Sequence, residues 1–290
     1  MSHPILVVCE SPYDFDICAR YIDRTIEAHG PDWAEGNLDA AREYIGIDTS
    51  SDVPSESFVR WGSIEKVTNY VTAHYLHQRE IIQFAQFGAG LPEPEHHYCM
   101  NFERFVNAVL FDTKLYEPDA IILQRRVASQ SLETESGNSQ KPVAIILLLD
   151  ADSDENRLKG LLNLNIRFQK IKVPIVIGVP DPETECWELA GFEHELTDAE
   201  AKQIDNVTKD LGGIHPIQQS HRLRAAKASD ARHPKNVLSR LICDVPSRRK
   251  QCHDAPFDLL KKNGRDNGLS DFLDRLSNRT IPGIFGGKRE

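Results

Sequence analysis

The sequence predicts an α/β protein in which a parallel sheet is flanked by helices. Three short apolar runs have the composition of strands buried on both faces: Pro4–Cys9, Val143–Leu149 and Val173–Val179. Acidic residues follow each run, and a helical pattern follows the acidic residues. Core strands are therefore expected near residues 4–10, 143–150 and 173–179. Their acidic residues should gather at the carboxyl edge of the sheet, where ligands bind in such folds.

The first strand is expected to lead directly into a helix. Glu10 ends the strand, and a short turn precedes a helix over about residues 14–29. Asp14 is expected to cap this helix at its N-terminus. Its apolar residues fall on one face: Ile17, Cys18, Tyr21 and Ile22.

The segment of about residues 30–131 is expected to be a helical insertion between the first two core strands. It should contain a short helix around Asp39–Tyr44 and a short strand at Phe58–Gly62. Helical spacing then predicts two longer helices, beginning near Ser63 and Asn101. Residues 132–142 are polar and rich in turn formers, so we expect a mobile connection to the next core strand.

The second core strand ends in an acidic run that contains the main candidate site. Asp150 and Asp152 follow seven consecutive apolar residues, with only Ala151 between them. Paired carboxylates on rigid backbone suit Mg²⁺, which prefers oxygen ligands. Asp154, in the same run, is a further candidate ligand. In the alternative interpretation, Asp150 ends the strand and Asp152 or Asp154 caps the next helix.

The next helix and strand complete a right-handed βαβ unit. Leu158, Leu161, Leu162 and Ile166 are expected to line the helix. Glu185 follows the third core strand and is a candidate for a further metal or water contact. Alternatively, Glu185 is a first-turn acid that the helix dipole favours, and Trp187 packs in the core.

The C-terminal part, about residues 214–282, is expected to be helical and basic. The whole chain carries a net charge of −10, but from residue 220 onward 16 Lys and Arg face 8 Asp and Glu. Arg222, Arg224 and Lys227 are therefore candidate phosphate contacts. Lys235, in the first turn of a helix begun by Pro234, could neutralise charge that develops on phosphate. Alternatively, these side chains are solvated helix faces.

Composition narrows the class of protein. The 290 residues are 40% hydrophobic, enough for one elaborated domain over residues 1–290. The six cysteines lack paired spacing, so zinc and disulfide frameworks are not expected. No apolar run is long enough to cross a membrane, and the chain begins with a strand where a signal peptide would need a basic start. We expect a cytoplasmic protein without a membrane partner; homo-oligomers are compatible with the sequence.

Near its start the chain has a strand, Glu10 and a helix; later it has a strand, Asp150-x-Asp152 and a helix. This order resembles that of the Toprim family, the catalytic domain of topoisomerases, primases and OLD-type nucleases. The resemblance implies that Glu10, Asp150 and Asp152 hold Mg²⁺, or Mn²⁺ in its place, for phosphodiester chemistry. It implies that Glu10 also serves as general acid and base. Glu185-x-Trp187 is similar to a pattern in small Toprim-like proteins. These motifs cover about a tenth of the chain.

The resemblance implies a nuclease that cleaves DNA or RNA. Small free-standing Toprim proteins often belong to prokaryotic defence systems against phage and act beside an ATPase. No Gly-x-x-x-x-Gly-Lys-Ser/Thr loop occurs here, so the ATPase would be a separate chain. The cysteines provide no zinc module for a primase, and no Tyr is identified as a topoisomerase nucleophile. The alternatives are a non-catalytic Toprim-like regulatory or partner-binding protein, and a phosphotransfer domain, for which the chain is too long.

Overall fold

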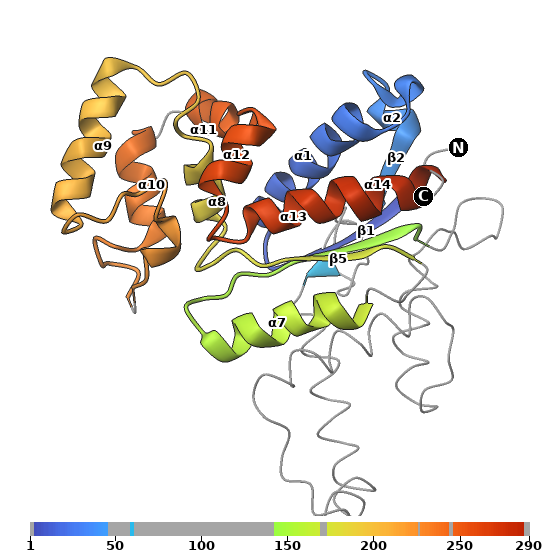
Figure 1. Ribbon diagram of the computed structural model, residues 1–290, viewed down its shortest axis with the longest axis horizontal. Helices are drawn as coiled ribbons and strands as arrows, with labels where there is room; N and C mark the ends of the chain where they lie inside the picture. Colours follow the sequence, from blue (N-terminus) through green and yellow to red (C-terminus); the bar gives the residue numbers. More distant parts are fainter. Residues whose placement is uncertain are drawn as a thin grey trace, which may run out of the picture.

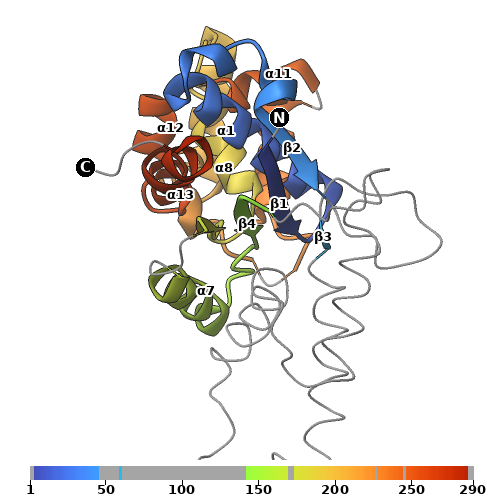
Figure 2. The same ribbon diagram turned by 90° about the vertical axis from the view of Figure 1, so that its right-hand side faces the viewer.

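The computed structural model describes residues 3–45, 59–60, 142–168, 173–225, 227–243 and 246–286. Its centre is a parallel sheet with the order β2-β1-β4-β5, in which β3 also pairs with β1 (Figures 1 and 2). The strands are β1 (His3–Cys9), β2 (Arg42–Ile45), β3 (Val59–Arg60), β4 (Ala144–Leu148) and β5 (Ile175–Gly178). The predicted α/β class and all three predicted core strands are confirmed.

The three core strands lie side by side because each is apolar on both faces. Residues 5–9 of β1 and every residue of β4 and β5 are buried. Val7 of β1 pairs with Ile146 of β4, and Ile146 pairs in turn with Val176 of β5. Parallel strands of this kind require helices on both faces. Their carboxyl ends reach the same edge of the sheet, and this alignment brings the acids after β1 and β4 together.

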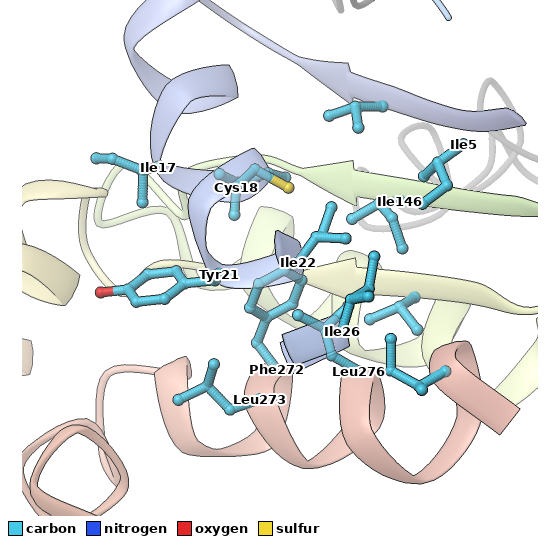
Figure 3. Close-up of a cluster of buried hydrophobic side chains, with 14 of the residues drawn as sticks. Ile5, Ile17, Cys18, Tyr21, Ile22, Ile26, Ile146, Phe272, Leu273 and Leu276 are labelled. Atoms are coloured by element: carbon cyan, nitrogen blue, oxygen red, sulfur yellow. The ribbon is translucent and has the colours of Figure 1, made fainter. Parts of the chain in front are cut away.

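One face of the sheet is covered by the first helix and the last helices of the chain (Figure 1). These are α1 (Pro12–His29), α12 (Phe257–Asn263), α13 (Leu269–Arg275), the π-helix η5 (Leu276–Thr280) and α14 (Ile281–Phe285). Figure 3 shows Ile22 and Ile26 of α1 packed between the strand residue Ile146 and Phe272 of α13. The C-terminal helices thus belong to the same core as the N-terminal strand.

Helix α7 (Glu155–Arg167) lies on the opposite face (Figures 1 and 2). Leu161 and Leu164 are buried, whereas Leu162 and Ile166 are 44% and 63% exposed. The predicted apolar face was therefore partly wrong. A polar residue, Asn165, lies on the buried face instead: its side chain accepts from the N–H of Ile177 (3.0 Å) and donates to the C=O of Ile177 (2.9 Å), which satisfies backbone groups of β5, at the edge of the sheet in its described part.

A second apolar cluster holds the helices that follow β5. These are α8 (Glu185–Ala190), α9 (Asp198–Asp210), the 3-10 turn η4 (Ser220–Arg222), α10 (Pro234–Ile242) and α11 (Pro246–His253). Leu189, Ile204 and Leu238 are among its buried residues. The predicted helical C-terminal part is confirmed, and Pro234 begins α10 as expected. None of the described helices is long and apolar enough to span a membrane.

Two local predictions for the N-terminal part need correction. Ser11, and not Asp14, caps α1: its side chain accepts from the N–H of Asp14 (3.3 Å), which lies in the first turn. The helix expected over 39–44 is only the four-residue α2 (Leu38–Ala41), and β2 follows it at once, because those residues find β1 as a pairing partner. The short turn η1 (Asp32–Ala34) precedes α2.

The strand expected at 58–62 is present as the two-residue β3. The helices expected from Ser63 and Asn101, and the connection over 132–141, lie outside the described residues. The segment predicted to be a helical insertion therefore contributes two strands, β2 and β3, to the sheet within its described residues.

Candidate active site

A pocket of about 390 Å³ opens at the carboxyl edge of the sheet. It is lined by residues that follow β1 and β4 and by residues of α1, α8, α10 and α11: Glu10, Ser11, Tyr13, Asp14, Asp150, Glu185, Lys235 and Arg249. Four of the sequence-predicted site residues therefore share one pocket: Glu10, Asp150, Glu185 and Lys235. Glu10 and Asp150 meet although they are far apart in the sequence, because the parallel strands β1 and β4 present their carboxyl ends together.

Asp150 lies just beyond the end of β4 and is held in place by one hydrogen bond. The hydroxyl of Thr184 donates to its Oδ1 at 2.6 Å. Burial raises the pKa of Asp150 well above its ordinary value; the Thr184 bond opposes this, and the charges of Asp14, Glu10 and Glu185 add to it. The pocket thus concentrates negative charge around a carboxyl that is costly to ionise.

Glu185 and Lys235 form an ion pair across the pocket, with Nζ and Oε1 3.9 Å apart. Burial raises the pKa of Glu185 to about 7, although Lys235 lowers it. For Lys235, burial lowers the pKa, but Glu185, Glu183, Asp150 and Asp14 outweigh burial, and the net pKa is raised. Lys235 is therefore a firmly protonated cation, and its side chain is 62% exposed and accessible to a ligand.

Asp152 does not line this pocket. Its carboxylate pairs with the guanidinium of Arg157, and the same guanidinium pairs with Glu10. Burial raises the pKa of Glu10, and Arg157 opposes that rise. Asp154 caps α7: its Oδ1 accepts the N–H of Arg157 at 3.2 Å. The alternative interpretation of Asp154 as a helix cap is thus confirmed.

Backbone hydrogen bonds fix the loop that carries these acids. The N–H of Ala151 donates to the C=O of Pro180 (2.8 Å), and the N–H of Asp152 donates to the C=O of Pro182 (2.9 Å). Asp152 and Ser153 have φ angles of 52° and 59°, in the left-handed region that non-glycine residues seldom adopt. The loop after β4 is therefore attached to the loop after β5. Among the described residues, no three His, Cys, Asp or Glu side chains are arranged to hold a metal ion.

A buried polar group behind the pocket was not predicted from the sequence. Glu188 is completely buried and contacts His253 Nε2 at 2.8 Å and Arg249 Nε at 3.8 Å. The Arg249 guanidinium lies 5.4 Å from the ring centre of Tyr13. Glu188 thus holds a cation of the pocket wall in place. The Glu185-x-x-Glu188 spacing, one helical turn, was the available signal for it.

The three candidate phosphate contacts in the C-terminal part do not line the pocket. Arg224 is paired with Asp181, whose two carboxylate oxygens lie 3.0 and 2.9 Å from one guanidinium nitrogen. Arg222 and Lys227 are exposed. A role in phosphate binding stays a prediction for all three residues, and Arg224 already has an acidic partner in Asp181.

The raised carboxyl pKa values predict how stability depends on pH. The folded metal-free protein retains protons on Glu10, Asp150 and Glu185 that the unfolded chain releases, so these groups stabilise the fold at low pH and lose that contribution as pH rises; for Glu185 the loss occurs as pH rises through its pKa of about 7. Between low pH and pH 7.5, the unfolding free energy of Glu185→Gln should therefore fall less than that of the wild type, by up to about 3 kcal/mol.

Urea denaturation in EDTA between pH 5 and 7.5 measures this effect. Asp205→Asn, which removes an exposed carboxyl on α9, is the control and should follow the wild-type curve. If the pH slope of Glu185→Gln matches that of the wild type, the assignment of a raised pKa to Glu185 is wrong.

Comparison of the chain with protein-family models, with curated proteins and with solved structures gave no match.

Proposed function

We propose that the protein is a Mg²⁺-dependent nuclease of the Toprim type that cleaves DNA or RNA phosphodiester bonds. One observation carries this proposal: Glu10 after β1 and Asp150 after β4 line the same pocket, together with Glu185 and the cations Lys235 and Arg249. The resemblance of the Glu10 and Asp150-x-Asp152 motifs to the Toprim family supports it.

The chemistry of the pocket fits a hard divalent cation. Its acidic lining consists of four carboxyls, against two cationic side chains, and oxygen donors are what Mg²⁺ prefers. Burial raises the pKa of Asp150 and the neighbouring acids add to this rise, so a bound cation would favour the ionised carboxylate. Glu10 and Asp150 are the residues proposed to hold Mg²⁺, or Mn²⁺ in its place, with Glu185 in contact through water. When bound, Mg²⁺ would supply an activated water and stabilise the leaving oxygen.

The remaining side chains of the pocket supply positioning and proton transfer. We assign to Lys235 and Arg249 the binding of the non-bridging oxygens of a phosphate; their partial exposure and their ion pairs with Glu185 and Glu188 support this role. Proton transfer is assigned to Glu185 in preference to Glu10, because the Glu185 pKa is about 7, whereas Glu10 is already paired with Arg157.

The proposed function is tested by incubating the purified protein with labelled single- and double-stranded DNA and RNA in Mg²⁺, Mn²⁺ or EDTA. We expect products in Mg²⁺ or Mn²⁺ and none in EDTA. Binding without cleavage in every metal would instead support the alternative, a non-catalytic Toprim-like regulatory protein. That alternative is favoured by one observation: in the described part of the chain, Arg157 neutralises Glu10 and Asp152.

The wider setting of the proposal comes from the resemblance. We propose a cytoplasmic component of a prokaryotic antiviral defence system that acts with a separate ATPase chain. Co-purification of the protein with an ATPase, and nuclease activity that depends on that partner, would support this setting.

Nucleic-acid binding should depend on two exposed basic residues, Arg222 of η4 and Lys227, which follows it in the chain. The double substitution Arg222→Gln with Lys227→Gln should weaken binding to all sequences. It should also reduce the salt dependence of log K by about 0.7–0.9 for each phosphate that the variant no longer binds. Fluorescence anisotropy with a labelled oligonucleotide, measured at several salt concentrations in EDTA, gives both quantities.

The matched control removes two exposed charges elsewhere, with Lys202→Gln and Lys209→Gln on α9. Equal changes of salt slope in both double variants would mean that net charge alone, and not phosphate binding by Arg222 and Lys227, accounts for the affinity.

A further inference from the structure

Arg157 occupies the space between two of the predicted metal ligands. It belongs to the first turn of α7, its side chain is 11% exposed, and its guanidinium pairs with Glu10 on one side and Asp152 on the other. Glu10 follows β1 and Asp152 follows β4, so one cationic group joins the acids of two adjacent strands. This is the position in which a cation shared by Glu10 and Asp152 would lie.

The backbone around Arg157 leaves Asp152 little freedom to turn toward the pocket. The N–H of Asp152 is bonded to Pro182, and the residue has a left-handed φ of 52°. The N–H of Arg157 is itself bonded to the Asp154 cap. Asp150, only two residues earlier, faces the pocket and is fixed there by Thr184. The two aspartates of the Asp-x-Asp motif therefore have different surroundings: Asp152 pairs with the Arg157 guanidinium, and Asp150 lines the pocket.

We propose that the site binds a single divalent cation, held by Glu10 and Asp150, and that the Arg157 guanidinium takes the place of a second cation between Glu10 and Asp152. This inference rests on the proposed function and specifies its metal content. It also assigns Arg157, which the sequence motifs do not include, to the site.

The energetics favour one ion over two. A second divalent cation between Glu10 and Asp152 would have to displace a largely buried guanidinium from both of its carboxylate partners. The guanidinium is only 11% exposed, so its charge would be left uncompensated, which is destabilising although Glu10 and Asp152 are themselves 34% and 48% exposed. Between Glu10 and Asp150, in contrast, four carboxyls and two cationic side chains line the pocket, so a cation there meets an excess of negative charge.

Titration with Mn²⁺ tests this proposal without relying on activity. Isothermal calorimetry, with free Mn²⁺ followed by electron paramagnetic resonance, should give one ion per wild-type chain. Asp152→Asn should still bind one ion within about threefold of the wild-type affinity, whereas Asp150→Asn should lose at least about tenfold. Asn tolerates the left-handed conformation at residue 152, so this variant should fold.

The second arm changes Arg157 itself. Arg157→Gln should bind two Mn²⁺ ions, because Glu10 and Asp152 are then free to share one; Lys159→Gln, an exposed position on the same helix, should still bind one. If Arg157→Gln does not fold, the comparison of Asp152→Asn with Asp150→Asn decides. Two ions in the wild type, one ion in a folded Arg157→Gln, or loss of binding in Asp152→Asn equal to that in Asp150→Asn would each overturn the inference while the proposed function stands. No bound ion in the wild type would refute both.

Discussion

The substitution Asp150→Asn is expected to lower the rate of Mg²⁺-dependent cleavage by about 100- to 1,000-fold or more, while the protein remains folded. Asp150 is the proposed cation ligand that no other charged side chain neutralises through a direct contact in the described residues; its hydrogen-bond partner is the Thr184 hydroxyl. Removing its negative charge weakens the attraction for the cation, because Asp150 is one of only four carboxyls that line the pocket.

The fold should tolerate this change because Asn keeps the shape and the hydrogen bond. The side-chain oxygen of Asn can still accept from Thr184 at the place of Oδ1. Burial and the charges of Asp14, Glu10 and Glu185 already oppose ionisation of Asp150. A neutral side chain relieves that opposition, so the unfolding free energy at pH 7.5 in EDTA should be equal to or higher than that of the wild type.

Cleavage rate and denaturation midpoint, measured on the same preparations, check both parts of the prediction. Asp154→Asn is the control: it changes an exposed acid of the same loop, and Asn caps a helix about as well as Asp. Asp154→Asn should retain most of its activity. Full activity of Asp150→Asn would remove Asp150 from the site, and equal losses in both variants would point to a general effect of charge in the loop.

The sheet could be predicted because its strands carry their own signal. The runs before Glu10 and Asp150 are apolar at every position, and short runs of this kind are typical of strands that are buried on both faces. β2 lacks the signal: Arg42, Glu43 and Tyr44 are polar or aromatic, and they become a strand only because β1 lies beside them. Local sequence favoured a helix there, and tertiary pairing overrode it.

The site could be predicted in part for the same reason. Glu10 and Asp150 each follow a core strand, so the pairing of β1 with β4 brings them together whatever the structure of the segment between these strands. Arg157 could not be predicted, because a charged residue in the first turn of a helix gives no indication that it will be buried against two acids. Its burial depends on the pairing of β1 with β4, which brings residue 10 to residue 157. Ile166 on the same helix shows the opposite error. Its apolar side chain was expected to be buried, but it is exposed, and the polar Asn165 is buried against β5.

Trp187 links the pocket to the core, and Trp187→Ala is expected to lower the unfolding free energy by about 3–5 kcal/mol. The side chain is completely buried, and its ring lies 4.9 Å from that of Phe272, between centroids. It also covers Gly178 of β5, where even an added Cβ would come within 2.8 Å of the indole. Such a loss is a large share of the total stability of a typical domain.

The hydrogen bond of the indole adds to this loss. Trp187 Nε1–H donates to the C=O of Asn267 at 2.8 Å, and that carbonyl keeps the N–H of Asp181 as a second partner when the indole is removed. The carbonyl is therefore not orphaned, and the cavity accounts for most of the effect. Because Trp187 lies between Glu185 and Glu188 on α8, loosening this helix should also weaken metal binding at the pocket.

Trp33→Ala provides the matched control, since Trp33 is 51% exposed and contacts Phe285 edge-on at 5.7 Å between ring centroids. It should cost less than about 1 kcal/mol. Urea denaturation at pH 7.5 gives both values, and Trp187→Phe, which fills part of the cavity, should fall between wild type and Trp187→Ala if the alanine variant is too unstable to purify. If the denaturation midpoints of Trp187→Ala and Trp33→Ala coincide, Trp187 does not hold α8 against the sheet. The position of Glu185 would then have to depend on its ion pair with Lys235.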